Sequence, residues 1–353
     1  MLFRSKEFES RSSGKIKVTI QDNLELFSQK AVQAERRYGI KPQQVVTRAR
    51  GKVKEEPVIL GAAITCGLEK VVIPFFDYGI PVEYELIRSV STVAKSQRKK
   101  LGVVRTDAQF MGGIDFSGGG FRNLPREQII DELEKQYEVE AVEPNGPIDT
   151  SKYDVLLVVQ PSSLTQQELD NVTQAVKQGI PTAIFEDPLP AMMPQAPGTG
   201  DPKRQSPMMS MMGGGQPPPK GNIRMVWEVL GIKVEGEERG PGNFQSVVVW
   251  QRFNPYPKLA SQRFGDEWVF VSPDAPDTSE PFNPTDPVTA GLEEVLFPFP
   301  GAIEANPDRS SDLTFTPIAT TGKRSGTISP SDYRANAEDP VALQVKRGLH
   351  KRT

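Results

Sequence analysis

The alternation of apolar and polar positions in residues 153–188 predicts a strand, a helix and a second strand. Val155–Val159 is an unbroken aliphatic run, which is too short for a helix and typical of a strand that is covered on both faces. Residues 180–185 are predicted to be the next strand. Strand, helix and strand in succession make a βαβ unit, so we expect a parallel sheet with a right-handed crossover.

The sequence bounds the helix of this unit at both ends. Thr165 and Glu168 have the spacing of a capping box, in which each side chain satisfies a backbone donor at the helix start. Gly179 supplies the left-handed residue that ends a helix. Residues 166–178 are therefore predicted to be helical, and the apolar positions of one face are expected to dock on the sheet: Leu169, Val172 and Val176.

Residues 1–98 are predicted to form a separate α+β lobe. Its elements are a strand at residues 15–20, a helix ending at Tyr38, a hairpin of residues 58–65 and 70–76, and a helix after Pro81. Asp22 and Glu25 are spaced as a capping box for the first helix, whose apolar face would include Leu24 and Phe27. The lobe is therefore expected to contain an antiparallel sheet.

Residues 99–320 are predicted to form an α/β domain, an open doubly wound, mainly parallel sheet of flavodoxin-like or Rossmann-like type. Its elements are a strand at 101–104, a glycine-rich loop at 112–120, a helix from Pro125 with Ile129, Ile130, Leu133 and Tyr137 inward, a strand at 139–142, the βαβ unit, a helix at 223–230, and strands at 246–250, 268–271 and 313–318. The order strand, helix, strand, repeated once, is typical of this fold class. Residues 321–353 are expected to be an incomplete tail.

The amino-acid composition changes within this domain, between residues 190 and 221. The segment is rich in proline, glycine and methionine and contains Pro207-Met208-Met209-Ser210-Met211-Met212. Such a composition offers few side chains for a core, so we expect a disordered insertion that can be removed without loss of stability.

The overall charge gives no reason to expect nucleic acid as a partner. Lysine and arginine (42) nearly balance aspartate and glutamate (45) in 353 residues. The single cysteine, Cys66, has no internal partner for a disulfide. No apolar run is long enough to span a membrane and the start lacks a signal-peptide pattern, so the chain is expected to be a fragment.

The sequence lacks the residues that most catalytic sites require. The one histidine, His350, lies beside the C-terminus, where no packing would position it as a base. Cys66 lies in a predicted hairpin turn without a neighbouring base. The glycines of residues 112–120 match neither dinucleotide-binding nor phosphate-loop spacing. We therefore predict no enzyme activity, no metal site, no cofactor and no ATP binding.

Six polar residues follow the predicted parallel strands directly: Thr106, Asp107, Gln160, Ser162, Glu186 and Asp187. Open α/β sheets bind ligands at these strand ends, so the six residues are candidates for a ligand-binding crevice. Strand ends are also polar in nearly every protein of this class. Adjacent Glu186 and Asp187 should point to different sides, which disfavours a catalytic carboxylate pair.

An ordered set of segments carries a resemblance to a known family. The segments are residues 58–76 with Val82-Glu83-Tyr84-Glu85-Leu86, residues 153–188, Leu230-Gly231-Ile232-Lys233-Val234, Asp286-Pro287-Val288-Thr289-Ala290-Gly291-Leu292 and Phe297-Pro298-Phe299. Together they resemble the GldG-like auxiliary component of ABC-type transport systems related to bacterial gliding motility, whose extracytoplasmic region is similar to a domain of an intraflagellar transport protein. Many relatives carry a histidine in the turn where this chain has Thr106 and Asp107.

The resemblance implies a non-catalytic interaction module. It implies a region that faces the periplasm at the bacterial inner membrane, with membrane anchoring through segments absent from this chain. The implied partners are the permease and ATPase subunits of the transporter. The alternative from a different class is an α/β small-molecule or glycan binding domain, related to degenerate hydrolases or amidotransferases, that uses the crevice at the strand ends.

Overall fold

The computed structural model divides the chain into two compact units, which are described separately. It describes residues 2–22, 24–49, 52–77, 82–94, 97–115, 122–203, 219–238, 244–256, 265–278 and 280–349. Unit 1 comprises residues 1–99 and 132–138, and unit 2 comprises residues 100–131 and 139–353.

Unit 1 is an α+β unit, as expected. Its elements are α1 (Leu2–Arg11), α2 (Gln29–Tyr38), β1 (Gln43–Ala49), β2 (Lys52–Val58), β3 (Ala62–Cys66), β4 (Glu69–Ile73) and α3 (Val82–Ala94). Strands β3 and β4 form the predicted antiparallel hairpin, with Cys66 opposite Glu69. Ile73, Phe76 and Leu86 form the buried core of the unit, and Phe8 packs against them.

Three expectations for unit 1 are wrong. Residues 15–20 form no strand, because their backbone bonds to α1 instead: Val18 N donates to Glu9 Oε1 at 3.0 Å. Helix α2 begins at Gln29, since the Ser28 hydroxyl caps it by accepting from Ala31 N at 3.2 Å. Phe27, expected on the apolar helix face, is 93% exposed. The antiparallel pair β1 and β2 lies where a polar stretch had predicted no strand.

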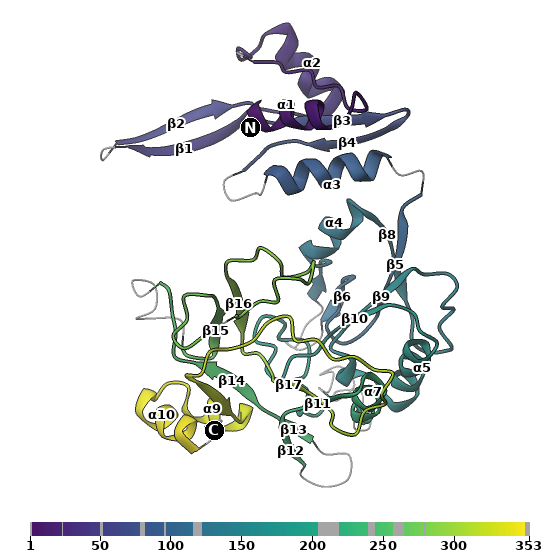
Figure 1. Ribbon diagram of the computed structural model, residues 1–353, viewed down its shortest axis with the longest axis vertical. Helices are drawn as coiled ribbons and strands as arrows, with labels where there is room; N and C mark the ends of the chain where they lie inside the picture. The colour runs from purple at the N-terminus through teal and green to yellow at the C-terminus, as the bar shows by residue number, and fades with distance from the viewer. Residues whose placement is uncertain are drawn as a thin grey trace. The chain divides into compact units, whose positions relative to one another are not determined.

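A four-stranded sheet in the order β10-β9-β5-β8 organises the first half of unit 2 (Figure 1). Its strands and the helices around them are β5 (Lys99–Val104), α4 (Gln128–Glu134), β8 (Tyr137–Val142), β9 (Val155–Val159), the short 3₁₀ helix η1 (Pro161–Ser163), α5 (Gln166–Lys177), β10 (Thr182–Phe185) and α7 (Arg224–Leu230). Strand β9 runs parallel to both β5 and β10. The βαβ unit predicted from the apolar pattern is confirmed.

The local boundaries of α5 are also as predicted. Thr165 and Glu168 form both halves of the capping box, and Gly179 has the left-handed φ of 86°. Helix α4 begins at Gln128 instead of Pro125, and Ile130 is buried whereas Ile129 is half exposed. Tyr137, expected on this helix, begins β8.

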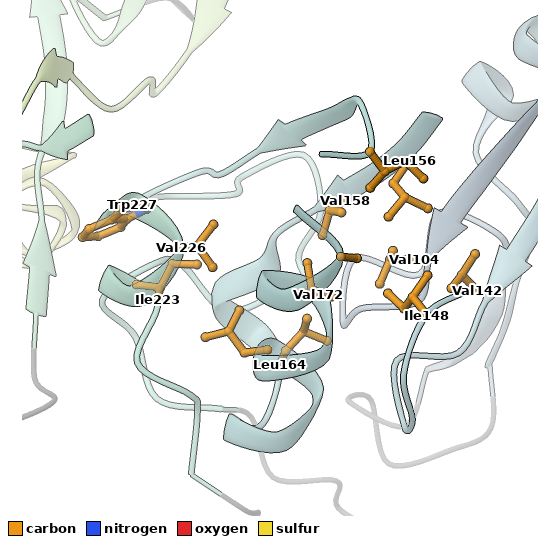
Figure 2. Close-up of a cluster of buried hydrophobic side chains, with 13 residues drawn as sticks. Val104, Val142, Ile148, Leu156, Val158, Leu164, Val172, Ile223, Val226 and Trp227 are labelled. Atoms are coloured by element: carbon orange, nitrogen blue, oxygen red, sulfur yellow. The ribbon is translucent and has the colours of Figure 1, made fainter. Parts of the chain in front are cut away.

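The core of the parallel sheet lies between its strands and the helices α5 and α7. Figure 2 shows Val104, Leu156 and Val158 of the sheet facing Val172 of α5 and Val226 of α7. Trp227 closes this cluster and packs edge-on against Phe244, with ring centroids 5.0 Å apart. Ile223 is the N-cap of α7, the preceding Asn222 accepts from Arg224 N through Oδ1 at 3.2 Å, and Gly231, with a φ of 65°, ends the helix.

The second half of unit 2 is built from pairs of short antiparallel strands. They are β11 (Ile232–Val234) with β17 (Ile303–Ala305), β12 (Gly236–Glu238) with β13 (Phe244–Ser246), β14 (Val248–Gln251) with β18 (Ser325–Ile328), and β15 (Trp268–Val271) with β16 (Val295–Pro298). A further short pair, β6 (Gly113–Asp115) and β7 (Arg122–Leu124), flanks residues 116–121, so most of the predicted glycine-rich loop lies outside the described residues.

The C-terminal region is part of this fold and not a tail. Strand β18 pairs with β14, and helices α9 (Pro330–Asn336) and α10 (Pro340–Leu349) follow it. Ile328 and Leu343 are buried in one cluster with Val248 and Trp250. Residues 313–318, expected as a strand, are irregular. The apolar pattern missed β18 because this strand includes serine, glycine and threonine and is buried by residues distant in the sequence.

The predicted insertion also departs from expectation at both ends. Residues 190–203 and 219–221 are described, and Ala196, Pro197, Gly198 and Thr199 are buried. Their backbone is hydrogen-bonded into unit 2, as the candidate site shows. The methionine run lies within residues 204–218, outside the described residues.

Candidate functional site

The structure brings the six predicted strand-end residues together at one edge of the parallel sheet. Thr106 and Asp107 follow β5, Gln160 and Ser162 follow β9, and Glu186 and Asp187 follow β10. Strand β5 lies between β8 and β9. The chain therefore adds β8 on one side of β5 and then β9 on its other side. This is the point at which open α/β sheets form a ligand crevice.

The Glu186 carboxylate is the centre of a hydrogen-bond network. It accepts from Ser162 Oγ at 2.5 Å, from Ser162 N at 3.1 Å and from Gln160 Nε2 at 3.0 Å. Thr199 Oγ1 donates to the same carboxylate at 2.6 Å. Burial raises the pKa of Glu186, while these donors and the positive charge of Lys220 oppose that shift.

Gln160 links all parts of the network. Its side chain is fully buried, and its backbone has a left-handed φ of 57°. Nε2 donates to the carbonyls of Asp187 and Pro197, each at 2.9 Å, and Oε1 accepts from Asp187 N at 3.0 Å. A glutamine in this backbone conformation is uncommon, and the bonds that it makes compensate the strain.

The β5 end of the site is closed by an ion pair. Lys203 Nζ lies 3.3 Å from Asp107 Oδ1 and donates to Ser163 O at 3.0 Å. Burial raises the pKa of Asp107, and the Lys203 ammonium acts against it. Thr106 Oγ1 donates to Val159 O at 2.5 Å, which joins β5 to the end of β9.

The Asp187 carboxylate accepts its hydrogen bond from a different donor than the carboxylate of its neighbour Glu186. Its Oδ1 accepts from Leu189 N at 2.7 Å and supports the turn after β10. Burial raises the pKa of Asp187 to about 6, with the adjacent Glu186 charge adding to the shift.

A segment that we name the covering segment, residues 195–203, lies over these strand ends. Gln195 Nε2 donates to Ala108 O at 2.9 Å, Pro197 O accepts from Gln160, Thr199 donates to Glu186, and Lys203 pairs with Asp107. Each of the three strand ends is therefore contacted by this segment. Gly198 is required for the close approach, because a Cβ there would lie 2.3 Å from Pro188 O.

Lys220 holds the covering segment from its other side. Its ammonium donates to the carbonyls of Gly198, Thr199 and Asp201 at 2.9, 3.0 and 2.9 Å. Burial lowers the pKa of Lys220 to about 8, against the attraction of the carboxylates of Glu186, Asp201 and Asp107. Sequence reasoning missed Thr199, Lys203 and Lys220 because all three lie within a stretch whose composition indicates disorder.

A cavity of about 340 Å³ adjoins the covering segment. It is lined by Leu189, Pro190, Ala191, Pro194, Asp201, Pro202 and Arg334. Arg334 of α9 binds the Asp201 carboxylate through both terminal nitrogens, at 3.0 and 2.5 Å. The cavity is therefore mostly apolar, with one neutralised ion pair in its wall.

The other candidate chemistries find no support in the part of the chain that the structure describes. No group of three or more histidine, cysteine, aspartate and glutamate side chains there could hold a metal ion. Cys66 is exposed, and His350 lies outside the described residues.

Comparison with known protein families places the chain. A family model described as an ABC-type uncharacterized transport system, auxiliary component, matches residues 98–349. The chain belongs to this family. The match includes the parallel sheet, the covering segment and the C-terminal helices of this ABC-transport auxiliary protein. No curated protein and no solved structure matches the chain significantly.

Family membership establishes a role in an ABC-type transport system. It also suggests that this auxiliary protein works in association with a membrane. Among the helices of the described residues, none is both long enough and apolar enough to cross a membrane.

The raised pKa of Asp187 predicts a pH-dependent effect of Asp187→Asn. Because the folded-state pKa of about 6 lies above the ordinary value of 3.8, the folded chain binds more protons than the unfolded chain between these values. Stability therefore falls as pH rises through this window. The asparagine keeps the acceptor for Leu189 N and removes the buried charge. We expect a higher thermal unfolding midpoint than wild type at about pH 7.5 and no difference at about pH 4.

The exposed Asp312→Asn is the matched control and should change the midpoint at neither pH. Equal midpoints of Asp187→Asn and wild type at both pH values would show that ionisation of Asp187 does not lower the stability of the folded protein.

Proposed function

We propose that this chain is a non-catalytic interaction module of an ABC transporter auxiliary subunit of the gliding-motility type. The observation that carries the proposal is the occupation of the crevice by the chain itself. The Glu186 carboxylate, the group best placed to act as an acid or base, accepts hydrogen bonds from Ser162, Gln160 and Thr199. A general base needs a free lone pair within reach of a substrate proton, and here the protein's own donors use that position.

The proposed partners are the permease and ATPase subunits of the same transport system, at the periplasmic face of the bacterial inner membrane. Family membership supports the association with a transport system. The near balance of positive and negative residues supports a protein partner over nucleic acid. The ATPase activity would belong to another subunit, because the sequence contains no phosphate-loop lysine motif.

Copurification tests this proposal. The affinity-tagged protein would be co-expressed with the permease and ATPase of a transport system from the same organism and purified in mild detergent. We expect all three proteins in one complex. As a control, the permease and ATPase would be passed over the affinity resin without the tagged protein. Recovery of neither subunit with the tagged protein would contradict the proposed partners.

Because the sequence lacks a phosphate loop, we expect that the isolated chain neither binds nor hydrolyses ATP. Titration calorimetry with Mg-ATP should give no saturable heat, and the chain should release no phosphate from ATP. Saturable binding in the micromolar range would overturn the expectation and would favour a nucleotide site at the glycine-rich loop.

The second candidate function is ligand binding in the crevice, by a small molecule or glycan. The gathering of Thr106, Asp107, Gln160, Ser162, Glu186 and Asp187 at the point where the sheet order reverses favours it. Any ligand at that point must first replace the covering segment, whose polar groups contact the same strand ends.

A further inference from the structure

The covering segment contacts the crevice in the way that a peptide ligand with a turn at residues 198–201 would. It places a hydroxyl, Thr199 Oγ1, on the Glu186 carboxylate at 2.6 Å. Four residues later it places an ammonium, Lys203 Nζ, between Asp107 Oδ1 at 3.3 Å and Ser163 O at 3.0 Å. These contacts match one donor to each of the two acidic strand ends. The crevice is thus complementary to a hydroxyl and a positive charge four residues apart on one peptide segment.

The segment is held by polar contacts more than by apolar burial. Within residues 190–203, all of which are described, the buried apolar side chains are the small ones of Pro190, Ala196 and Pro197, and Met192 is exposed. The larger anchor, Leu189, lies before the segment in the cluster of Val248 and Trp250. Each polar contact contributes only about 1 kcal/mol. Segments with so little apolar burial open at a lower free energy than the core of a domain.

Of these contacts, those that Lys203 makes with Asp107 and Ser163 are the ones that a competing ammonium group could replace most readily. The Lys203 side chain and that of Asp107 are both partly exposed, so water screens their ion pair. Lys220, by contrast, donates to three backbone carbonyls of the segment. The segment can therefore lose its contacts to the strand ends while the neighbouring chain stays folded.

We propose that the crevice is a docking site for a peptide segment of a partner protein, and that residues 195–203 occupy it as an intramolecular competitor. The partner segment carries a lysine four residues after a serine or threonine, and it replaces Thr199 on Glu186 and Lys203 on Asp107. This inference rests on the proposed interaction function and adds the surface, the chemistry of the partner and a device that keeps the surface closed until the partner arrives.

The test uses a synthetic peptide with the sequence of the covering segment, Gln-Ala-Pro-Gly-Thr-Gly-Asp-Pro-Lys. The chain is prepared as wild type and as Thr199→Ala/Lys203→Ala, in which the intramolecular contacts are weakened and both acidic strand ends remain. Because a closed state lowers the apparent affinity by the fraction that is open, we expect the double variant to bind the peptide at least about tenfold more tightly than wild type.

Two matched controls accompany the binding measurement. A peptide with valine for the threonine and alanine for the lysine should not bind the double variant. The variant Thr314→Ala/Lys233→Ala, which changes two exposed residues of unit 2, should bind as wild type does. Equal affinity of wild type and the Thr199→Ala/Lys203→Ala variant, or equal binding of the two peptides, would overturn the proposal.

Hydrogen exchange of the wild-type chain provides a test that needs no variant. The amides of Thr199 and Asp201 bond to Asp187 O and Gly198 O. We expect them to exchange at least about tenfold faster than the amides of β9, through local opening. Exchange of both sets only through global unfolding would show that the segment is a fixed part of the domain and would overturn the proposal. Copurification without peptide binding would refute this inference alone, whereas the loss of copurification would refute the proposed partners.

Discussion

Arg347→Ala is expected to cost unit 2 about 3–5 kcal/mol of unfolding free energy, because it leaves a buried carboxylate without its partner. Glu267, directly before β15, is 0% exposed. Its two oxygens accept from Arg347 Nε at 2.8 Å and from Arg347 Nη2 at 2.6 Å. Arg347 lies on α10, in the region that sequence reasoning had assigned to a tail outside the domain. The ion pair makes that region part of the fold.

Urea unfolding followed by tryptophan fluorescence measures this effect, since Trp227, Trp250 and Trp268 all belong to unit 2. The neighbouring Lys346→Ala is the matched control. Its ion pair with Asp332 at 3.1 Å is partly exposed and screened by water, so we expect a loss below about 1 kcal/mol. Replacing both partners, as Glu267→Gln/Arg347→Met, should cost less than Arg347→Ala alone, because no buried charge remains. A loss as small as that of Lys346→Ala would show that α10 does not stabilise the domain.

Gln160→Ala is expected to lower the unfolding free energy of unit 2 by about 2–4 kcal/mol. The fully buried side chain donates to Glu186 Oε1 and to the carbonyls of Asp187 and Pro197, and it accepts from Asp187 N. Alanine leaves these groups buried without that partner, and each such group costs about 1–3 kcal/mol, less what water can recover. The substitution should also loosen the covering segment, because Pro197 O loses its donor.

The same urea titration measures this loss, and hydrogen exchange of residues 195–203 measures the loosening. Gln178→Ala is the matched control, because this exposed glutamine at the end of α5 makes one exposed side-chain contact, accepting from Thr150 Oγ1 at 3.0 Å. We expect it to change stability by less than about 0.5 kcal/mol. If Gln160→Ala is no more destabilising than this control, water replaces the glutamine and the network is not a determinant of the fold.

The elements that could be read from the sequence are those whose signals are local. The apolar run of β9, the capping box of Thr165 and Glu168 and the left-handed Gly179 act within a few residues of each other, and the structure contains all of them. Parallel strands place their C-terminal ends at one edge, so the six candidate site residues could be named before their contacts were known. Their ligand-binding role stays a prediction.

The errors lie where an element depends on a distant partner. Strand β18 contains polar residues, and its burial depends on its pairing with β14 and on the packing of Ile328 with residues distant in the sequence. Helix α10 is held by the pairing of Arg347 with Glu267, which is eighty residues earlier in the chain. In unit 1, the segment at residues 15–20 has the alternation of a strand, but it bonds to α1 and has no strand partner. Alternation alone does not supply the neighbour that a strand requires.

The sequence by itself determined the parallel βαβ unit and the position of its polar edge, because both follow from the period and order of residues in one stretch of chain. Only the tertiary structure decided what occupies that edge. The composition of residues 190–203 correctly indicates that they build no apolar core, but a segment can also be fixed by donors and carbonyls that meet across space. Thr199 reaches Glu186, Lys203 reaches Asp107, and Lys220 binds the backbone of residues 198–201. Those hydrogen bonds depend on the spatial arrangement of separate loops, which no local pattern of residues encodes.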